Sequence, residues 1–259
     1  SEARQYCTFE MDFSKFDKSQ SSLVLEFELA FLRRFGVPEV LVELWRNGHM
    51  YCQARDPGTG ISFRTAYQRK TGDASTFFFN TLFVMGMMAH YFSRKESFPR
   101  FSLFAGDDSL LFFEKLPVVD STEFAFTYNM ELKTFTYSNP HFCSKFLIAT
   151  IDRWVLVPDP IKLCVKLARR DLRNFEHAEL YRISCEDIAK SLENVEAARI
   201  LTEAVFERYG VIIDGVQFCD AYIKLTNNPL DFKNLFHTMF PSLIDDTPLQ
   251  EQYLRYQFD

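Results

Sequence analysis

The sequence predicts an α+β fold in which an antiparallel sheet, backed by helices, is followed by a mainly helical part. In residues 1–155, short apolar runs alternate with turn residues, as in strands and hairpins. From Asp159-Pro160 onward, apolar residues recur at helical spacing. Asp followed by Pro is a typical helix start, because Asp caps the first amide groups and Pro suits the first turn. We therefore expect two parts, residues 1–155 and 156–259.

The composition is that of a globular protein. The chain has 259 residues, of which 47% are hydrophobic and 25% charged. Its net charge of −6 excludes a generally basic nucleic-acid coat, so any RNA contact must come from local basic patches. The six cysteines show no CxxC spacing, and we interpret them as reduced thiols.

The first part predicts strands and helices in alternation. Residues 6–11 predict a strand that leads into Asp12, and residues 20–35 and 40–45 predict two helices. A turn-rich ribbon follows over residues 50–70.

An apolar helix is predicted from Thr71-Gly72-Asp73 to about Tyr91. Its apolar core, residues 77–91, is shorter than the roughly 20 residues of a membrane span and contains polar residues, which favours a buried helix. Residues 101–113 predict a hairpin around Gly106-Asp107-Asp108. Residues 122–133 predict another helix, and residues 142–157 a β-ribbon.

The strongest functional signal is a set of carboxylates at the ends of these elements. Asp107 and Asp108 are adjacent like charges at a turn, which is unfavourable unless a cation is shared or one carboxyl is protonated. Phosphoryl transfer supplies such cations, because two Mg²⁺ ions can stabilise the attacking and leaving oxygens. Asp12 on a neighbouring strand would complete the clamp. Thr76 and Asn80 share a helical face and could point toward a sugar.

Each feature also has an ordinary structural interpretation. A single Gly-Asp-Asp is commonly only a hairpin turn, and the Asp12/Asp17 pair could be a solvated face or a cap. Asn80 could be a satisfied amide in the core. The order and the strand, helix and hairpin contexts together are more specific than any one of them.

Three segments carry a family resemblance. DFSKFDKSQ, YQRKTGDASTFFFNT and FAGDDSLLF resemble motifs A, B and C of the RNA-dependent RNA polymerases of positive-strand RNA viruses. More narrowly, they resemble the alphavirus-like supergroup on its closterovirus- or tobamovirus-like plant side. The resemblance covers residues 5–175 and continues more weakly to the end. It implies a right-hand polymerase, with a palm and partial fingers in residues 1–155 (fingers about 18–70) and a thumb in residues 156–259.

The resemblance implies a role for each motif residue. Asp12 and Asp107 would be metal ligands and Asp108 an auxiliary one, with two Mg²⁺ ions as cofactors and Mn²⁺ able to substitute. Asp17 and Asn80, with Ser75 or Thr76, would recognise the ribose 2′-hydroxyl of the incoming nucleotide. Gly72 would give the loop before the helix freedom to move. Lys133 would protonate the leaving pyrophosphate, with a surface lysine as the alternative. Lys145 lies in the segment that resembles the primer grip. The following residues complete this set of site predictions: Asp12, Asp17, Gly72, Ser75, Thr76, Asn80, Asp107, Asp108, Lys133 and Lys145.

Two basic patches are candidates for RNA contact. The first is a stripe that would lie on one face of a helix, opposite an apolar face of Ile161, Cys164, Val165, Ala168 and Leu172. Such a helix suits a thumb that follows the phosphates of a duplex, and an ordinary solvated face is the alternative. The second patch precedes Gly72. The stripe consists of Lys162, Lys166, Arg169, Arg170 and Arg173, and the second patch of Arg64, Arg69 and Lys70.

Two rival functions remain open at this stage. A reverse transcriptase shares the palm, but Asp17 and Asn80 favour a ribonucleotide, and a DNA-making relative typically has a bulky aromatic near the place of Asp17. A non-catalytic RNA-binding or replicase-scaffolding module is the other rival.

The resemblance also implies partners: RNA template and product, ribonucleoside triphosphates and other replicase domains of methyltransferase and helicase type, with no DNA. It implies the host-cell cytoplasm, at membrane-associated replication complexes reached through other replicase parts. Members of the family carry basic fingers residues before the first motif. Because this chain starts almost at that motif, we expect it to synthesise RNA poorly on its own.

Overall fold

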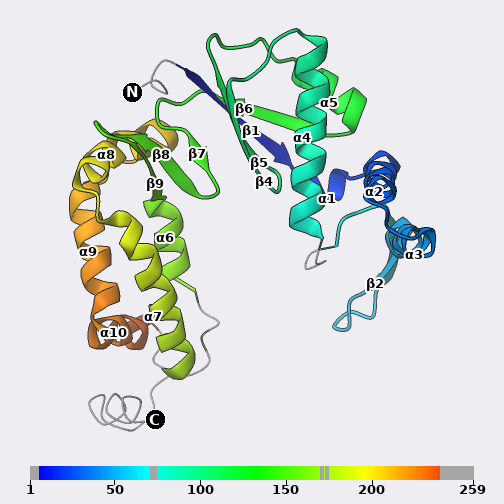
Figure 1. The fold of residues 1–259 in the computed structure, drawn as a ribbon. Coiled ribbons are helices and arrows are strands. Elements are labelled where there is room, and N and C mark those ends of the chain that lie inside the picture. The colour runs from blue at the N-terminus through cyan, green and yellow to red at the C-terminus, as the bar shows by residue number, and fades with distance from the viewer. Residues whose placement is uncertain (1–5, 71–74, 170–171, 173–174, 240–259) are drawn as a thin grey trace. The chain divides into compact units, whose positions relative to one another are not determined.

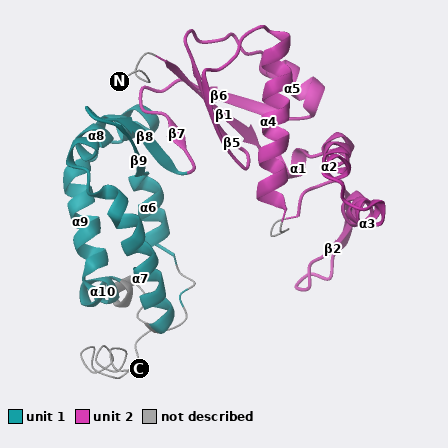
Figure 2. Cartoon of the chain, in the orientation of Figure 1, with its two compact units in different colours: residues 1, 144–259 teal, residues 2–143 magenta. Residues whose placement is uncertain are grey.

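The computed structural model describes residues 6–70, 75–169, 172 and 175–239 (Figure 1). The chain forms two compact units, residues 2–143 and residues 144–259 (Figure 2). The division lies closer to the N-terminus than the expected boundary at 155/156. The reason is that the hairpin after residue 143 belongs to the core of the second unit, where Phe146, Ile148 and Val157 pack with helical residues.

The first unit is built on a four-stranded antiparallel sheet. The strand order is β4-β5-β1-β6, so the N-terminal strand lies inside the sheet. Phe9, Met11 and Leu111 are buried on this sheet, and their side chains contribute to the largest core of the unit. The strands are β1 (Cys7–Ser14), β4 (Phe101–Ala105), β5 (Asp108–Phe113) and β6 (Glu131–Phe135), and a short strand β7 (His141–Phe142) ends the unit. This confirms the predicted strand and hairpin and the α+β class.

Helix α4 (Thr76–Arg94) covers the sheet, as the apolar run predicts (Figure 1). Phe83, Val84, Met87 and Met88 are buried in the same core as the strands. In the described part of the chain, no helix combines the length and the hydropathy needed to cross a bilayer. The burial of these four side chains confirms the expected buried helix.

The predicted helix over residues 122–133 is wrong in its second half. Helix α5 (Ser121–Tyr128) ends where Asn129 adopts a left-handed conformation with φ of 58°. The chain then enters β6, which pairs antiparallel with β1. Met130 and Leu132 are buried in the sheet core, so pairing and burial override the local helical pattern.

The segment between β1 and α4 forms a smaller subassembly. After the short helix α1 (Phe16–Ser19), α2 (Ser22–Arg34) and α3 (Glu39–Met50) pack around Leu25, Leu29 and Val42. Helix α3 is longer than the predicted 40–45. Strands β2 (Tyr51–Arg55) and β3 (Ser62–Ala66) form the predicted ribbon.

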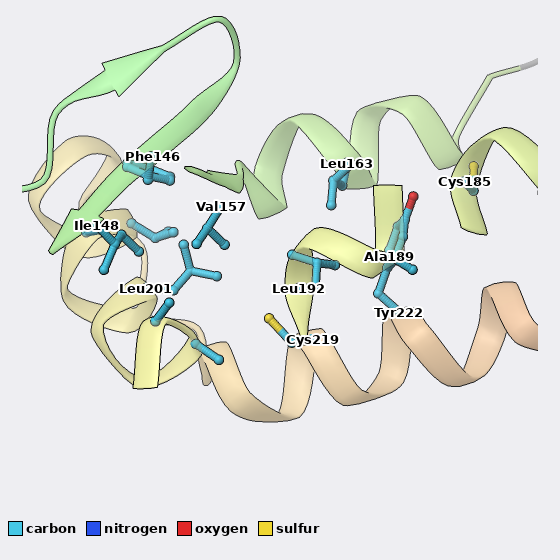
Figure 3. Packing of buried hydrophobic residues seen from close by; sticks show 14 of the residues in the cluster. Phe146, Ile148, Val157, Leu163, Cys185, Ala189, Leu192, Leu201, Cys219 and Tyr222 are labelled. Atoms are coloured by element: carbon cyan, nitrogen blue, oxygen red, sulfur yellow. The ribbon is translucent and has the colours of Figure 1, made fainter. Parts of the chain in front are cut away.

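The second unit is a helical bundle that packs against an antiparallel hairpin. Figure 3 shows Phe146, Ile148 and Val157 of the hairpin beside Leu163, Leu192 and Leu201 of the helices. The hairpin is β8 (Lys145–Ala149) and β9 (Trp154–Pro158), and the helices are α6 (Pro160–Leu167), α7 (Phe175–Ala189), the 3-10 helix η2 (Lys190–Leu192), α8 (Val195–Tyr209), α9 (Gly215–Asn227) and α10 (Pro229–Met239). The predicted β-ribbon and helical second part are confirmed.

Asp159 starts the bundle as predicted. Its Oδ1 accepts hydrogen bonds from the backbone N–H groups of Ile161, at 2.9 Å, and Lys162, at 3.4 Å. The Tyr209 hydroxyl, at the end of α8, donates to the other carboxylate oxygen. One buried carboxylate thus caps α6 and ties it to α8.

We predict an alkaline destabilisation that depends on Tyr209. Partial desolvation and the hydrogen bond to Asp159 raise the pKa of Tyr209, which is 37% exposed, from 10.0 to about 12. Because the folded-state pKa is raised, this stabilisation is fully present below pH 10 and is lost as the pH rises toward 12. Between pH 10 and 12, the free energy of unfolding measured in urea should fall more steeply for the wild type than for Tyr209→Phe. An equal dependence of this free energy on pH in both proteins would contradict the prediction.

Candidate active site

The Gly106-Asp107 turn is held by the sheet on one side and by a helix on the other. Ala105 pairs with Asp108, which leaves Gly106 and Asp107 as a two-residue hairpin turn. Gly106 has φ of 65°, a conformation that glycine adopts without strain. Its N–H donates to Thr81 Oγ1 of α4 at 2.8 Å. The turn that carries Asp107 is therefore fixed to the central helix.

Strand pairing brings Asp12 to the same end of the sheet. Met11 of β1 lies opposite Ser109 of β5, and Ser109 Oγ donates to the Met11 carbonyl at 3.2 Å. The next pair toward the end of the sheet is Asp12, which follows Met11, and Asp108, which precedes Ser109. The sequence separates these two carboxylates widely, and the register makes them neighbours at one sheet end.

Lys133 lies on the other side of Asp12. The two residues are direct partners in the β1–β6 ladder, and both side chains are exposed. Directly opposed residues project from the same face of a sheet. The structure therefore places the cation of Lys133 next to Asp12, on the strand opposite to the one that carries Asp108.

The carboxylates repel one another. The pKa of Asp107 is raised, first by partial desolvation beside the turn and further by the negative charges of Asp108, Asp17 and Asp12. Its own backbone N–H opposes this shift in part. A bound cation would favour the charged form and reverse the effect.

This set of carboxylates could act as ligands that share one divalent metal ion. Among the residues that the structure describes, no three acidic, histidine or cysteine side chains form a complete metal-binding cluster. Mg²⁺ usually takes one or two carboxylates and completes its shell with water and substrate phosphates. The crowded carboxylates around Asp107 suit that mode of binding.

A second polar group adjoins the carboxylates. Asn80 of α4 donates through Nδ2 to Asp17 Oδ1 at 2.9 Å, and Gln20 Nε2 donates to Asn80 Oδ1 at 2.8 Å. Asp17 lies on α1, so the structure brings together the first motif and the helix as predicted. Thr76 Oγ1 donates to the carbonyl of Lys70 at 3.2 Å.

Two further predicted positions, Ser75 and Gly72, belong to the segment at the start of α4. Ser75 precedes α4 as its N-cap residue. Gly72 lies outside the described residues.

Arg69 is placed differently from the expectation. Its guanidinium is buried and pairs with Glu28, and the two side chains are only 1% and 2% exposed. Trp45 Nε1 donates to the same carboxylate at 2.9 Å. Arg69 therefore holds the α2–α3 subassembly together and is not exposed for RNA. Lys70 Nζ is exposed and donates to the Gly48 carbonyl at 2.9 Å.

The predicted basic stripe is not one continuous helix. Helix α6 ends at Leu167 with Ala168 as its C-cap, so Arg169 lies beyond it. The Arg169 guanidinium lies over the Tyr181 ring, 4.8 Å from its centroid. Arg170 and Arg173 lie outside the described residues. Leu172, beyond the end of α6, is buried in the bundle core.

The apolar face assigned to that helix is also partly wrong. Cys164, Val165 and Ala168 are exposed, and the buried residues of α6 are Pro160 and Leu163. Lys162 and Lys166 remain exposed on α6, and Lys145 is exposed on β8. Lys162 Nζ donates to Ser144 Oγ at 3.2 Å.

Sequence reasoning missed Gln20, Glu28 and Thr81, which hold Asn80, Arg69 and Gly106. Gln20 ends the first motif, immediately before a helix, and its polarity beside Asn80 is visible only in the fold. Glu28 does have a sequence signal, because Leu25 and Leu32, three and four positions away, share its face of the predicted helix. A charge on an apolar helix face indicates a buried partner.

Comparisons with known proteins agree with this geometry. Residues 1–235 match the family model described as RNA dependent RNA polymerase. The chain is 40% identical over 231 residues to the RNA replication protein of Citrus leprosis virus C, covering 88% of this chain and 9% of that protein. It is 37% identical over 205 residues to the RNA-directed RNA polymerase 2a of Brome mosaic virus, covering 78% and 25%. The chain belongs to the RNA-dependent RNA polymerase family, on its alphavirus-like side.

A solved structure supports the fold. The RNA-dependent RNA polymerase of a human picobirnavirus superimposes with a TM-score of 0.63 at 13% identity, covering 93% of this chain and 46% of that chain. At that identity the likeness shows the fold alone. The chain spans only 9% and 14% of the length of the first two relatives, the Citrus leprosis virus C protein and the replicase large subunit of Tobamovirus Ob.

Proposed function

We propose that this chain carries the catalytic centre of a viral replicase and directs template-dependent RNA synthesis. The observation that carries the proposal is the convergence of Asp12, Asp107 and Asp108 at one sheet end, beside Lys133. The match of residues 1–235 to the RNA dependent RNA polymerase family supports the proposal. Residues 1–155 would act as palm with partial fingers, and residues 156–259 as thumb.

The acidic residues would hold divalent metal, with two Mg²⁺ ions as our specific proposal and Mn²⁺ as a substitute. When bound, the metal stabilises charge on the attacking and leaving oxygens of the phosphoryl transfer. Asp12 and Asp107 bind it, and Asp108 assists. Lys133 donates a proton to the leaving pyrophosphate. Most of the rate gain from these residues is positioning and charge neutralisation.

The nucleotide is selected by its sugar at a separate group of residues. Asp17 accepts a hydrogen bond from the ribose 2′-hydroxyl, and Asn80 orients the carboxylate. Ser75 or Thr76 assists in recognising the sugar, and Gly72 keeps its assignment from sequence. A deoxyribonucleotide leaves the Asp17 acceptor without its donor, which favours RNA over DNA.

The proposed partners follow from the reaction. They are an RNA template and product, ribonucleoside triphosphates and other replicase domains, in the host-cell cytoplasm at membrane-associated complexes. Lys145, Lys162 and Lys166 are exposed candidates for phosphate contact, together with Lys70. Arg170 and Arg173 keep the same assignment from sequence.

Template dependence tests the proposal. The 259-residue chain, and a longer form extended at its N-terminus, are given a primed RNA template, Mg²⁺ and one labelled ribonucleotide at a time. Only the complementary nucleotide should be added, and a chelator should stop the addition. If both folded forms bind RNA and neither adds a nucleotide, the result would favour a non-catalytic binding or scaffolding module.

A further inference from the structure

Gln20 is a buried polar residue whose side chain points at a functional residue. It follows α1 directly and is 6% exposed. Its Nε2 donates a hydrogen bond of 2.8 Å to Asn80 Oδ1. Burying an amide donor costs free energy unless the donor makes a hydrogen bond. The bond to Asn80 meets that requirement, and it also joins Gln20 to a residue of the candidate site.

The bond determines which way the Asn80 amide faces. A primary amide has an acceptor end and a donor end. Because Gln20 occupies the oxygen, the nitrogen of Asn80 faces Asp17 Oδ1 and donates to it at 2.9 Å. The reversed amide would set its oxygen against the Asp17 carboxylate. Asn80 itself is 4% exposed, so water does not replace Gln20 easily.

The backbone around Asp17 is fixed independently. The N–H of Arg69 donates to the Asp17 carbonyl at 3.1 Å, and Asn129 Nδ2 donates to the Ser19 carbonyl at 2.8 Å. With the main chain held, the remaining freedom of Asp17 is the rotation of its carboxylate. The bond from Asn80 restrains that rotation and leaves the second oxygen to accept from a sugar hydroxyl.

We propose that Gln20 is a positioning residue that sets ribose selectivity. It acts through Asn80 on Asp17 and touches no substrate. The inference rests on the proposed function, since it assigns the selectivity of the same site to a residue outside it. Gln20 should therefore affect the rate of ribonucleotide addition and leave the rate of deoxynucleotide addition unchanged.

Gln20→Met tests this assignment, because methionine is of similar length and lacks the donor. Single-turnover addition of a ribonucleotide and of its deoxy analogue is measured on one primed template. The ratio of the two rates should fall by roughly two- to tenfold, the range for one lost hydrogen bond. The ribonucleotide rate should carry the fall, with the deoxynucleotide rate unchanged.

Two further variants sharpen the test. In Gln20→Glu, the ionised carboxylate can only accept hydrogen bonds. It should therefore turn the Asn80 amide nitrogen away from Asp17 and reduce the ratio further. Tyr128→Phe is the matched control. It removes a partly buried hydrogen bond of 2.5 Å between the Tyr128 hydroxyl and His90, which lies on α4 like Asn80, and it should keep the ratio.

The outcomes separate the two claims. If neither the folded 259-residue chain nor its N-terminally extended form adds a nucleotide, the proposed function is overturned and this inference with it. If the wild type prefers ribonucleotides and Asn80→Ala loses that preference, an unchanged ratio in both folded Gln20 variants overturns the role of Gln20 alone.

Discussion

Asp107→Ala should lower the rate of ribonucleotide addition by about three orders of magnitude. A metal bound at these carboxylates supplies several kcal/mol of charge stabilisation in the transition state, and about 4 kcal/mol corresponds to that loss. The change should leave folding intact, because Asp107 is an exposed turn residue. It should even relieve repulsion, since Asp108, Asp17 and Asp12 raise the Asp107 pKa. Single-turnover addition on a primed template measures the effect.

The matched control is Asp56→Ala. Asp56 also lies at an exposed hairpin turn, where its carboxylate accepts from Gly58 N–H at 3.0 Å and Thr59 Oγ1 at 2.6 Å. It has no carboxylate neighbours among the groups that shift its pKa. Its variant should retain wild-type addition. Retention of activity in Asp107→Ala would remove Asp107 from the metal site.

Glu28→Ala should lower the free energy of unfolding by about 3–5 kcal/mol. Loss of this carboxylate leaves the buried Arg69 guanidinium unpaired, and such a charge is costly in the protein interior. It also removes the acceptor of Trp45 Nε1. Urea unfolding followed by tryptophan fluorescence measures the change.

The double variant Glu28→Leu with Arg69→Met should recover most of that loss, because apolar residues of similar volume can replace a buried ion pair. Arg33→Ala is the control for an exposed pair, since Arg33 and Glu39 are 40% and 59% exposed. It should cost about 1 kcal/mol or less. A Glu28→Ala loss as small as that of Arg33→Ala would contradict the structural role of Arg69.

The carboxylate site could be predicted because its parts have local signals. Asp12 belongs to an apolar strand, and Asp107 stands at a two-residue turn between two apolar runs. Local sequence does not reveal strand order, so the neighbouring positions of Asp12 and Lys133 came from the fold. β6 was missed for the same reason, since its strand pairing with β1 joins residues far apart in the chain.

The basic patches show the limit of charge patterns. Arg69 reads as an exposed cation beside Lys70, yet its partner Glu28 lies 41 residues earlier and buries it. The stripe from Lys162 assumed one helix, whereas α6 ends at Leu167. The charge pattern alone does not show this helix end, nor that Leu172 beyond it is buried in the bundle core.

Ribose discrimination tests the central claim most directly. The addition of one template-matched ribonucleotide and of its deoxy analogue is timed on a primed RNA template with Mg²⁺, using the N-terminally extended form beside the 259-residue chain. The account predicts rapid, template-matched addition that strongly prefers the ribonucleotide. Preference for the deoxynucleotide would indicate a reverse transcriptase, and no addition by folded, RNA-binding protein would contradict a polymerase active site.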